Sequence, residues 1–182
     1  EGVRDDGSRF QVRLQTFPLF GQNGKVDAFI EIAEDISERK LMENALRESE
    51  QKYRTILETM KEGYYESDLA GNFTFFNDSM CRIHGYTRDE LMGMNNRAYM
   101  DEETAKKVYN IFTNVFRTGK STTMYDWQII RKDGSKVDFE ASVSLIRDVS
   151  GNPTGFRGIV RDITKRKRAE EALREIVEAE RR

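Results

Sequence analysis

The feature of this sequence that most constrains its fold is an internal repeat. Residues 6–47 align without a gap on residues 133–174, at an offset of 127 positions (162 minus 35), with 14 identities among 42 positions. Both copies begin with Asp-Gly-Ser and pass through Asp-Ile-Ser or Asp-Ile-Thr into a charged segment. Self-similarity at a fixed spacing indicates that one supersecondary unit occurs twice. The sequence therefore predicts two copies of a strand-to-helix junction.

The first copy of the repeat begins within residues 1–36. Apolar and polar side chains alternate over residues 10–16, and Asn23-Gly24 is typical of a hairpin turn. An isolated hairpin of two strands is only marginally stable in water. We therefore interpret residues 1–36 as the closing hairpin of a truncated upstream domain, in a fragment of a longer protein. Residue 1 is neither a methionine nor part of a signal peptide, which fits this interpretation.

Residues 37–60 are predicted to form a connecting helix. Its seam positions recur at alternating steps of four and three, the heptad pattern of a coiled coil. One interpretation is a single amphipathic helix packed on its own domain, the other is a parallel two-chain coiled coil, and the two can coexist. A similar seam occurs in the predicted exit helix at 164–182. The residues expected to pair in a homodimer are Met42, Leu46, Tyr53, Ile56, Leu173 and Ile176.

Residues 61–163 have the pattern of a complete domain. Strands are expected at 63–67, 72–76, 122–131, 136–147 and 154–163, and the longest internal helix at 102–118. Asn77 or Asp78 is expected to cap a short helix, and Thr87 with Glu90 has the pattern of a capping box. The order of elements predicts an α+β fold: a five-stranded antiparallel sheet with helices on one face, flanked by amphipathic coiled-coil-type helices.

Three segments carry a resemblance to a known family. They are residues 77–91 (NDSMCRIHGYTRDEL), 131–135 (RKDGS) and 155–164 (GFRGIVRDIT). On these motifs the sequence resembles a PAS domain with a C-terminal PAC motif, over about residues 49–167. The resemblance implies a sensory module of a bacterial or archaeal protein such as a sensor histidine kinase, a cyclase or a transcriptional regulator. Such modules often stand in tandem and are joined by helices.

The expected function is signal transduction to a downstream output domain, with a histidine kinase as the expected output. One alternative is a passive dimerisation or spacer module without a ligand, and another is a redox sensor that holds flavin or haem. The fragment itself shows no Gly-rich phosphate loop, no nucleophile motif and no histidine free to act as a general base. We therefore expect it not to be catalytic.

Composition narrows the class of partner. The formal net charge of -2 gives no reason to expect nucleic acid, and no apolar run is long enough to predict a membrane span or membrane contact. The single cysteine, Cys81, excludes an internal disulfide and fits a reducing, cytoplasmic location. The partners we expect are a second copy of the chain and a small-molecule ligand of unknown identity.

No cofactor is predicted. Relatives that bind haem typically carry a histidine on the long helix, whereas the only histidine here is His84, which we expect to be a structural or surface side chain. Light-sensing flavin relatives need a thiol where Asn96 stands, so a cysteinyl-flavin adduct is not expected, although non-covalent flavin stays open. Cys81 and His84 lie three residues apart, but two ligands do not make a zinc site.

The candidate ligand pocket follows from the family architecture and from the alternation of the strands. For each candidate the competing interpretation is plain core packing, because protein interiors are close-packed. Trp127 and Tyr99 are preferred, since each combines an apolar body with a polar tip. The candidates are Phe75, Ile83, Tyr99, Ile111, Phe112, Val115, Trp127, Ile129, Phe139, Ala141, Val143, Phe156 and Val160.

The strand-to-helix junction is the candidate signal relay. Thr164 is expected to be the N-cap of the exit helix. Residues 165–168 place positive charge at the positive end of the helix dipole, and Asp162 is expected to offset it by pairing with Arg166 or Lys167. One interpretation is an ordinary capped helix. The functional interpretation is a hinge through which changes in the sheet alter the exit helix.

Overall fold

The computed structural model describes residues 1–22, 24–122 and 125–180. The chain divides into two compact units, Glu1–Thr55 and Ile56–Arg182. The helix α1, Ser37–Thr59, contains the boundary between them. Its bounds agree with the connecting helix predicted from the heptad pattern.

The first unit contains two antiparallel strand pairs ahead of α1. Strands β1 (Gly2–Val3) and β2 (Arg9–Phe10) form one pair, and β3 (Val12–Phe20) and β4 (Val26–Asp35) form the other. The predicted turn at Asn23-Gly24 falls partly outside the described residues. Most side chains of β3 and β4 are exposed, including Phe29 at 65% and Leu14 at 60%. Within the described residues of this unit, the hairpin therefore has an uncovered apolar surface.

The repeat is reproduced in the pairing of the strands. Val12 pairs with Asp35 in the first hairpin, and Phe139 pairs with Asp162 in the second, which is the same register at the offset of the repeat. A shift of register near the turn also occurs in both copies. It lies between Leu19 and Phe20 in the first hairpin and at the equivalent positions, 146 and 147, in the second. The two copies therefore share a backbone arrangement as well as a sequence.

The second unit is an α+β domain, as predicted. Its elements are β5 (Gly63–Asp68), β6 (Phe73–Phe76), α2 (Asp78–His84), α3 (Arg88–Leu91), α4 (Glu102–Thr118), β7 (Tyr125–Ile130), β8 (Lys136–Arg147), β9 (Pro153–Asp162) and α5 (Thr164–Glu180). The strands form one antiparallel sheet in the order β6-β5-β9-β8-β7. The strand predicted at 122–131 begins at Tyr125, and residues 123–124 lie outside the described part of the chain.

The helices begin where short polar side chains cap them. The Asn77 side chain accepts from the backbone N–H of Met80 and caps α2, and Thr87 with Glu90 forms the predicted capping box of α3. Asp101 caps α4, which ends at Gly119 in the left-handed conformation. These local signals explain why the helix bounds could be predicted closely.

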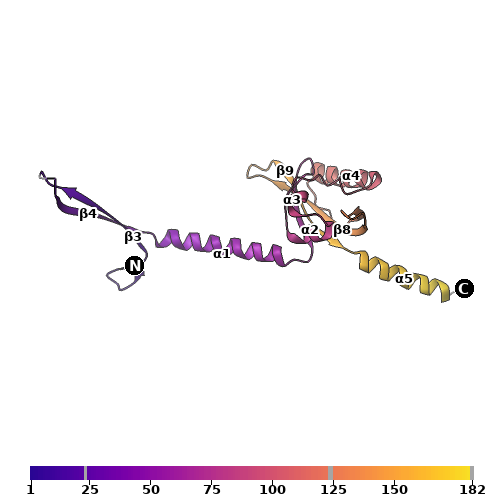
Figure 1. Cartoon of the computed structure of the whole chain (residues 1–182), viewed down its shortest axis with the longest axis horizontal. Coiled ribbons are helices and arrows are strands. Elements are labelled where there is room, and N and C mark those ends of the chain that lie inside the picture. The colour runs from indigo at the N-terminus through magenta and orange to yellow at the C-terminus, as the bar shows by residue number, and fades with distance from the viewer. Residues whose placement is uncertain (23, 123–124, 181–182) are drawn as a thin grey trace. The chain divides into compact units, whose positions relative to one another are not determined.

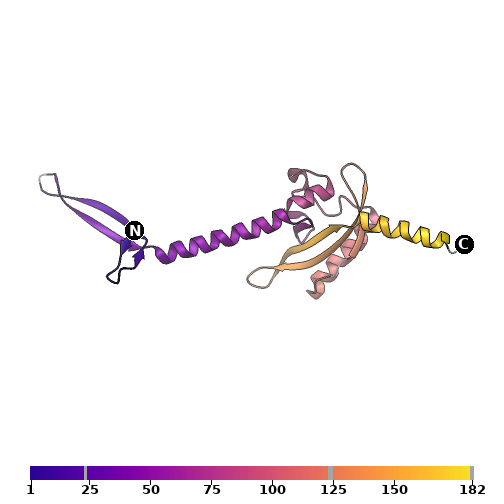
Figure 2. The same cartoon turned by 90° about the horizontal axis from the view of Figure 1, so that it is seen from below.

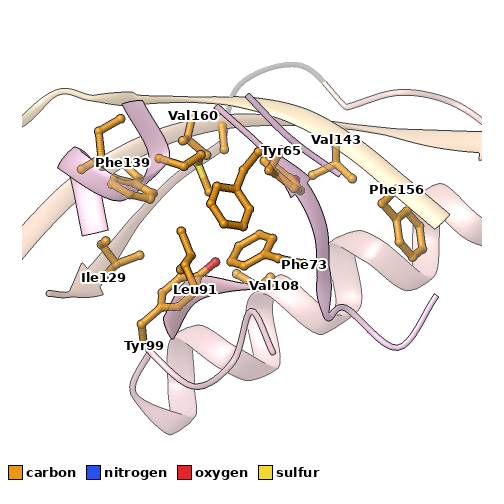
Figure 3. Close-up of a cluster of buried hydrophobic side chains, with 14 of the residues drawn as sticks. Tyr65, Phe73, Leu91, Tyr99, Val108, Ile129, Phe139, Val143, Phe156 and Val160 are labelled. Carbon is orange, nitrogen blue, oxygen red and sulfur yellow. The ribbon is translucent and has the colours of Figure 1, made fainter. Parts of the chain in front are cut away.

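The core lies where the helices meet one face of the sheet. Along β8, Val137, Phe139, Ala141 and Val143 are buried, and the residues between them are half-buried. They pack with side chains from α2, α3 and α4 (Figure 3), and α4 runs alongside β8 and β9 in both views (Figure 1 and Figure 2). The close approach of β8 to β9 requires a glycine at position 158, because a Cβ there would lie 2.0 Å from the carbonyl oxygen of Ser142.

Candidate functional site

Most of the predicted pocket residues converge in the domain interior. Ile111 and Trp127 are partly buried. The fully buried candidates are Ile83, Tyr99, Phe112, Val115, Ile129, Phe139, Ala141, Val143, Phe156 and Val160. They share one hydrophobic cluster, so the family architecture and the alternation of the strands correctly indicated that these side chains face the interior.

The prediction for Phe75 is wrong. This side chain is 41% exposed, and its ring makes an edge-on contact with Tyr64 at 6.1 Å. The register of β5 against β6 shifts between Glu66 and Ser67, and β6 consequently turns Phe73 and Phe76 inward rather than alternating strictly. Phe75 therefore lies outside the core.

The interior is filled by its own side chains. The enclosed space among Tyr65, Tyr99, Trp127 and Phe139 is only about 10 Å³, which is close to the smallest space that holds one water molecule. The indole Nε1 of Trp127 lies beside this space and has no hydrogen-bond partner among the described residues. In this conformation the predicted pocket is a packed core.

His84 is a buried side chain of this core. Its Nδ1 lies 2.9 Å from the carbonyl oxygen of Met80, so Nδ1 carries the proton and donates. The ring makes edge-on contacts with Tyr99 at 4.6 Å and Phe139 at 5.2 Å, and Nε2 has no partner among the described residues. The pKa of His84 is lowered to about 4, chiefly by burial; the hydrogen bond with the Met80 carbonyl opposes this effect, and the nearby positive charge of Arg131 adds to it. The imidazole is therefore neutral near pH 7.

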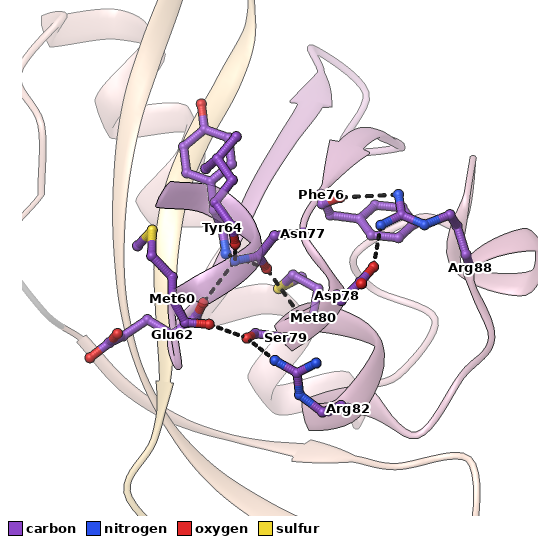
Figure 4. Close-up of polar contacts among 11 residues, drawn as sticks. Met60, Glu62, Tyr64, Phe76, Asn77, Asp78, Ser79, Met80, Arg82 and Arg88 are labelled. Carbon is purple, nitrogen blue, oxygen red and sulfur yellow. Dashed lines mark hydrogen bonds and ion pairs between the residues drawn. The ribbon is translucent and has the colours of Figure 1, made fainter. Parts of the chain in front are cut away.

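Asn77 fastens the end of α1 to the domain. Its Nδ2 donates to the carbonyl oxygens of Leu57 and Glu62, each at 3.0 Å. Its Oδ1 accepts from the backbone N–H groups of Tyr64, at 3.0 Å, and Met80, at 3.3 Å (Figure 4). One amide thus joins the last turn of α1, the start of β5 and the start of α2. The sequence predicted only its capping role, because the other partners are distant along the chain.

A second contact holds the same segment. The Ser79 hydroxyl donates to the carbonyl oxygen of Met60 at 2.6 Å and accepts from Arg82 at the same distance (Figure 4). Ser79 is 1% exposed. The entry clamp, defined as Asn77 and Ser79 with the carbonyls they bind, makes the end of α1 part of the second unit.

The exit junction, defined as residues 162–164 between β9 and α5, makes other contacts than those predicted. Thr164 is the first residue of α5, but its hydroxyl accepts from the backbone N–H of Asp138 at 3.0 Å, so it ties the helix to β8 rather than acting as an N-cap. Asp162 accepts from the Thr164 N–H at 2.9 Å and pairs with Arg131 at 3.1 Å. The expected pairing of Asp162 with Arg166 or Lys167 is wrong, because the guanidinium of Arg131 takes that carboxylate.

The basic first turn of α5 pairs instead with the neighbouring strands. Arg166 lies 3.2 Å from Glu140, and Lys167 lies 3.3 Å from Asp126 and 3.5 Å from Asp138. These carboxylates on β7 and β8 offset the positive charge that the helix dipole disfavours. The start of α5 therefore depends on the sheet for its stability.

An ion-pair chain links the segment after α1 to the start of α5. Arg161 on β9 lies 3.2 Å from Glu62 and 3.8 Å from Glu140, and Glu140 in turn pairs with Arg166. The side chain of Glu140 is only 14% exposed. Solvent and salt therefore screen its attraction to the two arginines less than they screen an ordinary surface ion pair. The segment after α1 and the first turn of α5 thus contact the same polar face of the sheet.

The junction of the first unit repeats these contacts. Asp35 accepts from the backbone N–H of Ser37 at 2.9 Å, and the Ser37 hydroxyl accepts from the backbone N–H of Gln11 at 2.9 Å. Arg4 pairs with Asp35 and Lys40 donates to the Gln11 side chain, as Arg131 and Lys167 do in the second copy. The repeat therefore extends to individual hydrogen bonds, which sequence identity alone did not reveal.

The predicted dimerisation residues are exposed on their helices. On α1 the exposed fractions are 64% for Met42, 62% for Leu46, 66% for Tyr53 and 47% for Ile56, and on α5 they are 63% for Leu173 and 57% for Ile176. Large apolar side chains at heptad spacing are thus available to a partner. Their pairing stays a prediction. Among the described residues, no helix has the length and apolar character needed to cross a membrane.

Comparison with known proteins places this geometry in a family. The family described as "PAS fold" matches residues 51–163, and one described as "PAS domain" matches residues 1–38. Two solved structures share the fold: the PAS domain of a protein from Colwellia psychrerythraea (TM-score 0.59, 17% identity, 63% of this chain and 97% of that one) and the PAS domain of an HTR-like protein from Haloarcula marismortui (TM-score 0.57, 21% identity, 68% and 99%).

The curated relatives include kinases and sensor proteins. Sporulation kinase C of Bacillus subtilis is 27% identical over 150 residues, which cover 79% of this chain and 35% of the kinase. Sensor protein FixL of Bradyrhizobium diazoefficiens is 27% identical over 145 residues, covering 78% and 28% respectively. The chain thus spans about a third or less of the length of these relatives.

Proposed function

Because this chain belongs to the PAS fold family and is homologous to the PAS regions of sensor kinases, we propose that it relays a conformational signal between two helices. The signal arrives along α1, crosses the sheet and leaves through α5 to an output domain, which we propose is a histidine kinase. The observation that carries this proposal is the exit junction, where Thr164 binds the first turn of α5 to β8 and Asp162 pairs with Arg131, the residue after β7.

The entry clamp supports the same direction of relay. Asn77 binds the carbonyl of Leu57, so a rotation or shift of α1 acts directly on β5 and α2. The ion-pair chain from Glu62 through Arg161 and Glu140 to Arg166 offers a route across the sheet that needs no ligand in the core. A signal acts only if it favours one of two arrangements of these contacts.

We also propose that the working form is a parallel homodimer located in the cytoplasm. The exposed seams of α1 and α5 supply the apolar positions of a two-chain coiled coil before and after the domain in the sequence. The duplicated junction and the family match of residues 1–38 support a tandem arrangement, in which the first hairpin closes an upstream PAS domain. Dimer pairing would let a change in α1 reach both α5 helices together.

One competing function has a specific observation in its favour. A passive spacer would need no ligand space, and the interior space of about 10 Å³ meets that requirement. A spacer and a relay differ in whether the exit junction matters for output. A spacer needs only that the dimer and the fold be intact.

The test uses the full-length protein with its own output domain. Thr164→Val removes the acceptor for the Asp138 N–H and costs about 1 kcal/mol, and Asp162→Asn weakens the pairing with Arg131. Thr154→Val, near the other end of β9, removes a hydroxyl that makes only a 3.5 Å contact and is the matched control. The relay predicts that both junction variants change output activity while the control does not. Unchanged output in folded, dimeric junction variants would leave the spacer as the explanation.

A further inference from the structure

The first hairpin has an apolar face that the second hairpin lacks. Strand pairing places Phe17 opposite Ile30, and the equivalent pair in the second copy is Ser144 and Arg157. In the second copy this face points away from the core, because the alternate residues, such as Val143, are the buried ones. The outward apolar face of the first hairpin consists of Phe17, Leu19, Ile30 and Ile32. We propose that this outward apolar face binds the same face of a second copy of the chain.

The repeat distinguishes the outward apolar face from the opposite, inward face. Successive side chains of a strand point to opposite faces, so Leu14 and Phe29 belong to the inward face. Their equivalents in the second copy, Ala141 and Phe156, are buried in the core. In the proposed tandem arrangement the upstream domain therefore covers the inward face with its own helices. The outward apolar face is not part of that core and needs a different partner.

The composition of the outward apolar face fits an apolar partner. Its four side chains are between 45% and 51% exposed. A strand that is buried on both faces is apolar throughout, whereas a solvated face carries polar side chains. Arg13 and Glu34 lie on the same face at the end nearest α1, and they pair with each other at 3.7 Å. Because these two charges offset each other, the face does not call for a charged partner.

The seam of α1 identifies the partner as a second copy. The pKa of Arg39 is raised chiefly by its hydrogen bond with Glu43, and the charge of Glu34 adds to this effect. Arg39 therefore lies on the side of α1 that is turned toward Glu34 and the outward apolar face. Met42 and Leu46 follow Arg39 by three and seven residues, so they lie on that same side of the helix. A second chain that pairs along the seam is thereby brought against the outward apolar face.

This inference rests on the proposed parallel dimer and tandem arrangement, and the experiment tests the two separately. Single cysteines are placed in the full-length protein after removal of its native cysteines, including Cys81→Ser. They are cross-linked with a bismaleimide that spans about 10 Å, the distance between two packed sheets. Gln15→Cys lies within the outward apolar face and removes no apolar side chain. Thr16→Cys, the next residue on the inward face, is the matched control, and Leu46→Cys reports pairing of the seam.

We expect an interchain product from Gln15→Cys and from Leu46→Cys. Thr16→Cys is expected to react about tenfold more slowly or less, because the inward face is covered within its own chain. The cross-linking rate is measured on denaturing gels as the fraction of covalent dimer over time.

Substitutions within the hairpin test whether the apolar contact drives the pairing. Ile30→Arg and Phe17→Ser, each added to Gln15→Cys, are expected to lower the cross-linking rate about tenfold or more, because each removes apolar surface from the contact. Leu14→Ala on the inward face is expected to leave the rate unchanged. All three substitutions introduce the residue that the second copy has at the equivalent position within the same strand pairing, so we expect the hairpin to fold in each variant.

Absence of an interchain product from Gln15→Cys would overturn the proposal, whatever the result for Leu46→Cys. That outcome is also expected if another segment of the same chain covers the outward apolar face. Equal rates for Gln15→Cys and Thr16→Cys, or a rate that survives both Ile30→Arg and Phe17→Ser, would overturn it as well. A product from Gln15→Cys without one from Leu46→Cys would support the contact between hairpins and refute the coiled-coil pairing of the proposed dimer.

Discussion

Acidification tests whether His84 is neutral within the fold. In the unfolded chain its pKa is near the ordinary value of 6.5, and in the folded domain burial lowers the pKa to about 4. Between these values the unfolded chain binds a proton that the folded chain does not, so the free energy of unfolding falls as the pH falls. The stabilisation is complete above pH 6.5 and is lost progressively as the pH drops through this window to about 4.

The magnitude follows from the two values. They differ by about 2.5, and each pKa unit corresponds to about 1.4 kcal/mol, so the full loss is about 3 kcal/mol. Of this, about 2 kcal/mol is lost by about pH 5. Because the side chain is fully buried, solvent screening does not reduce the effect much.

The assay is urea unfolding followed by the fluorescence of the single tryptophan, Trp127, at about pH 7.5 and about pH 5. Carboxylates also lose stability in acid, among them Glu90, whose pKa is lowered to about 2 chiefly by the hydrogen bond from Lys132. The non-titrating variants His84→Gln and His84→Met keep those groups, so the difference between wild type and variant isolates His84. A second variant is included in case one fails to fold.

We expect wild type to lose about 2 kcal/mol more than either variant over this interval. NMR gives an independent check, because the only histidine of the chain yields a single ring signal to titrate. A ring that titrates near 6.5 in the folded protein, or equal losses in wild type and variants, would refute the burial argument.

Three further changes test the fold and the dimer. Asn77→Ala leaves several backbone groups without a partner and is expected to cost about 3 kcal/mol in urea unfolding; a loss below about 1 kcal/mol would contradict the entry clamp. Gly158→Ala places a Cβ against the Ser142 carbonyl and is expected to cost about 3 kcal/mol or to prevent folding, and a neutral result would show that the strands are not so close. Leu46→Ser is expected to shift the chain from dimer to monomer in light scattering. Leu41→Ser, which lies off the heptad seam and is similarly exposed, is expected to leave the dimer intact. Equal effects of the two variants would contradict dimerisation through the seam.

Local signals made much of the fold predictable. The capping box at Thr87 and the N-cap at Asn77 each depend on residues close together in sequence, and the structure confirms the elements they delimit. The repeat added a long-range prediction, because it indicated that the same pairing of strands would occur twice. The buried face of β8 followed from simple alternation of side chains.

The predictions that were wrong concerned contacts between residues that are far apart in the sequence. Asp162 has several basic residues within reach, and sequence proximity favoured Arg166, whereas the sheet brings Arg131 alongside. Phe75 was misplaced because a shift of register has no signature in a four-residue strand.

The duplicated junction has a practical consequence for building new sensors. Asp35 and Asp162 hold equivalent backbone N–H and guanidinium groups, and the Ser37 and Thr164 hydroxyls accept from equivalent backbone N–H groups. The chain can therefore be spliced from Asp35 directly to Ile163 with these contacts replaced by their counterparts. Whole domains can then be removed or inserted at this point, and the contact to redesign is that of Arg166, because the residue equivalent to its partner Glu140 in the first copy is Arg13. A protein of this kind can change the number of its stages while the linkage from each stage to the next stays the same.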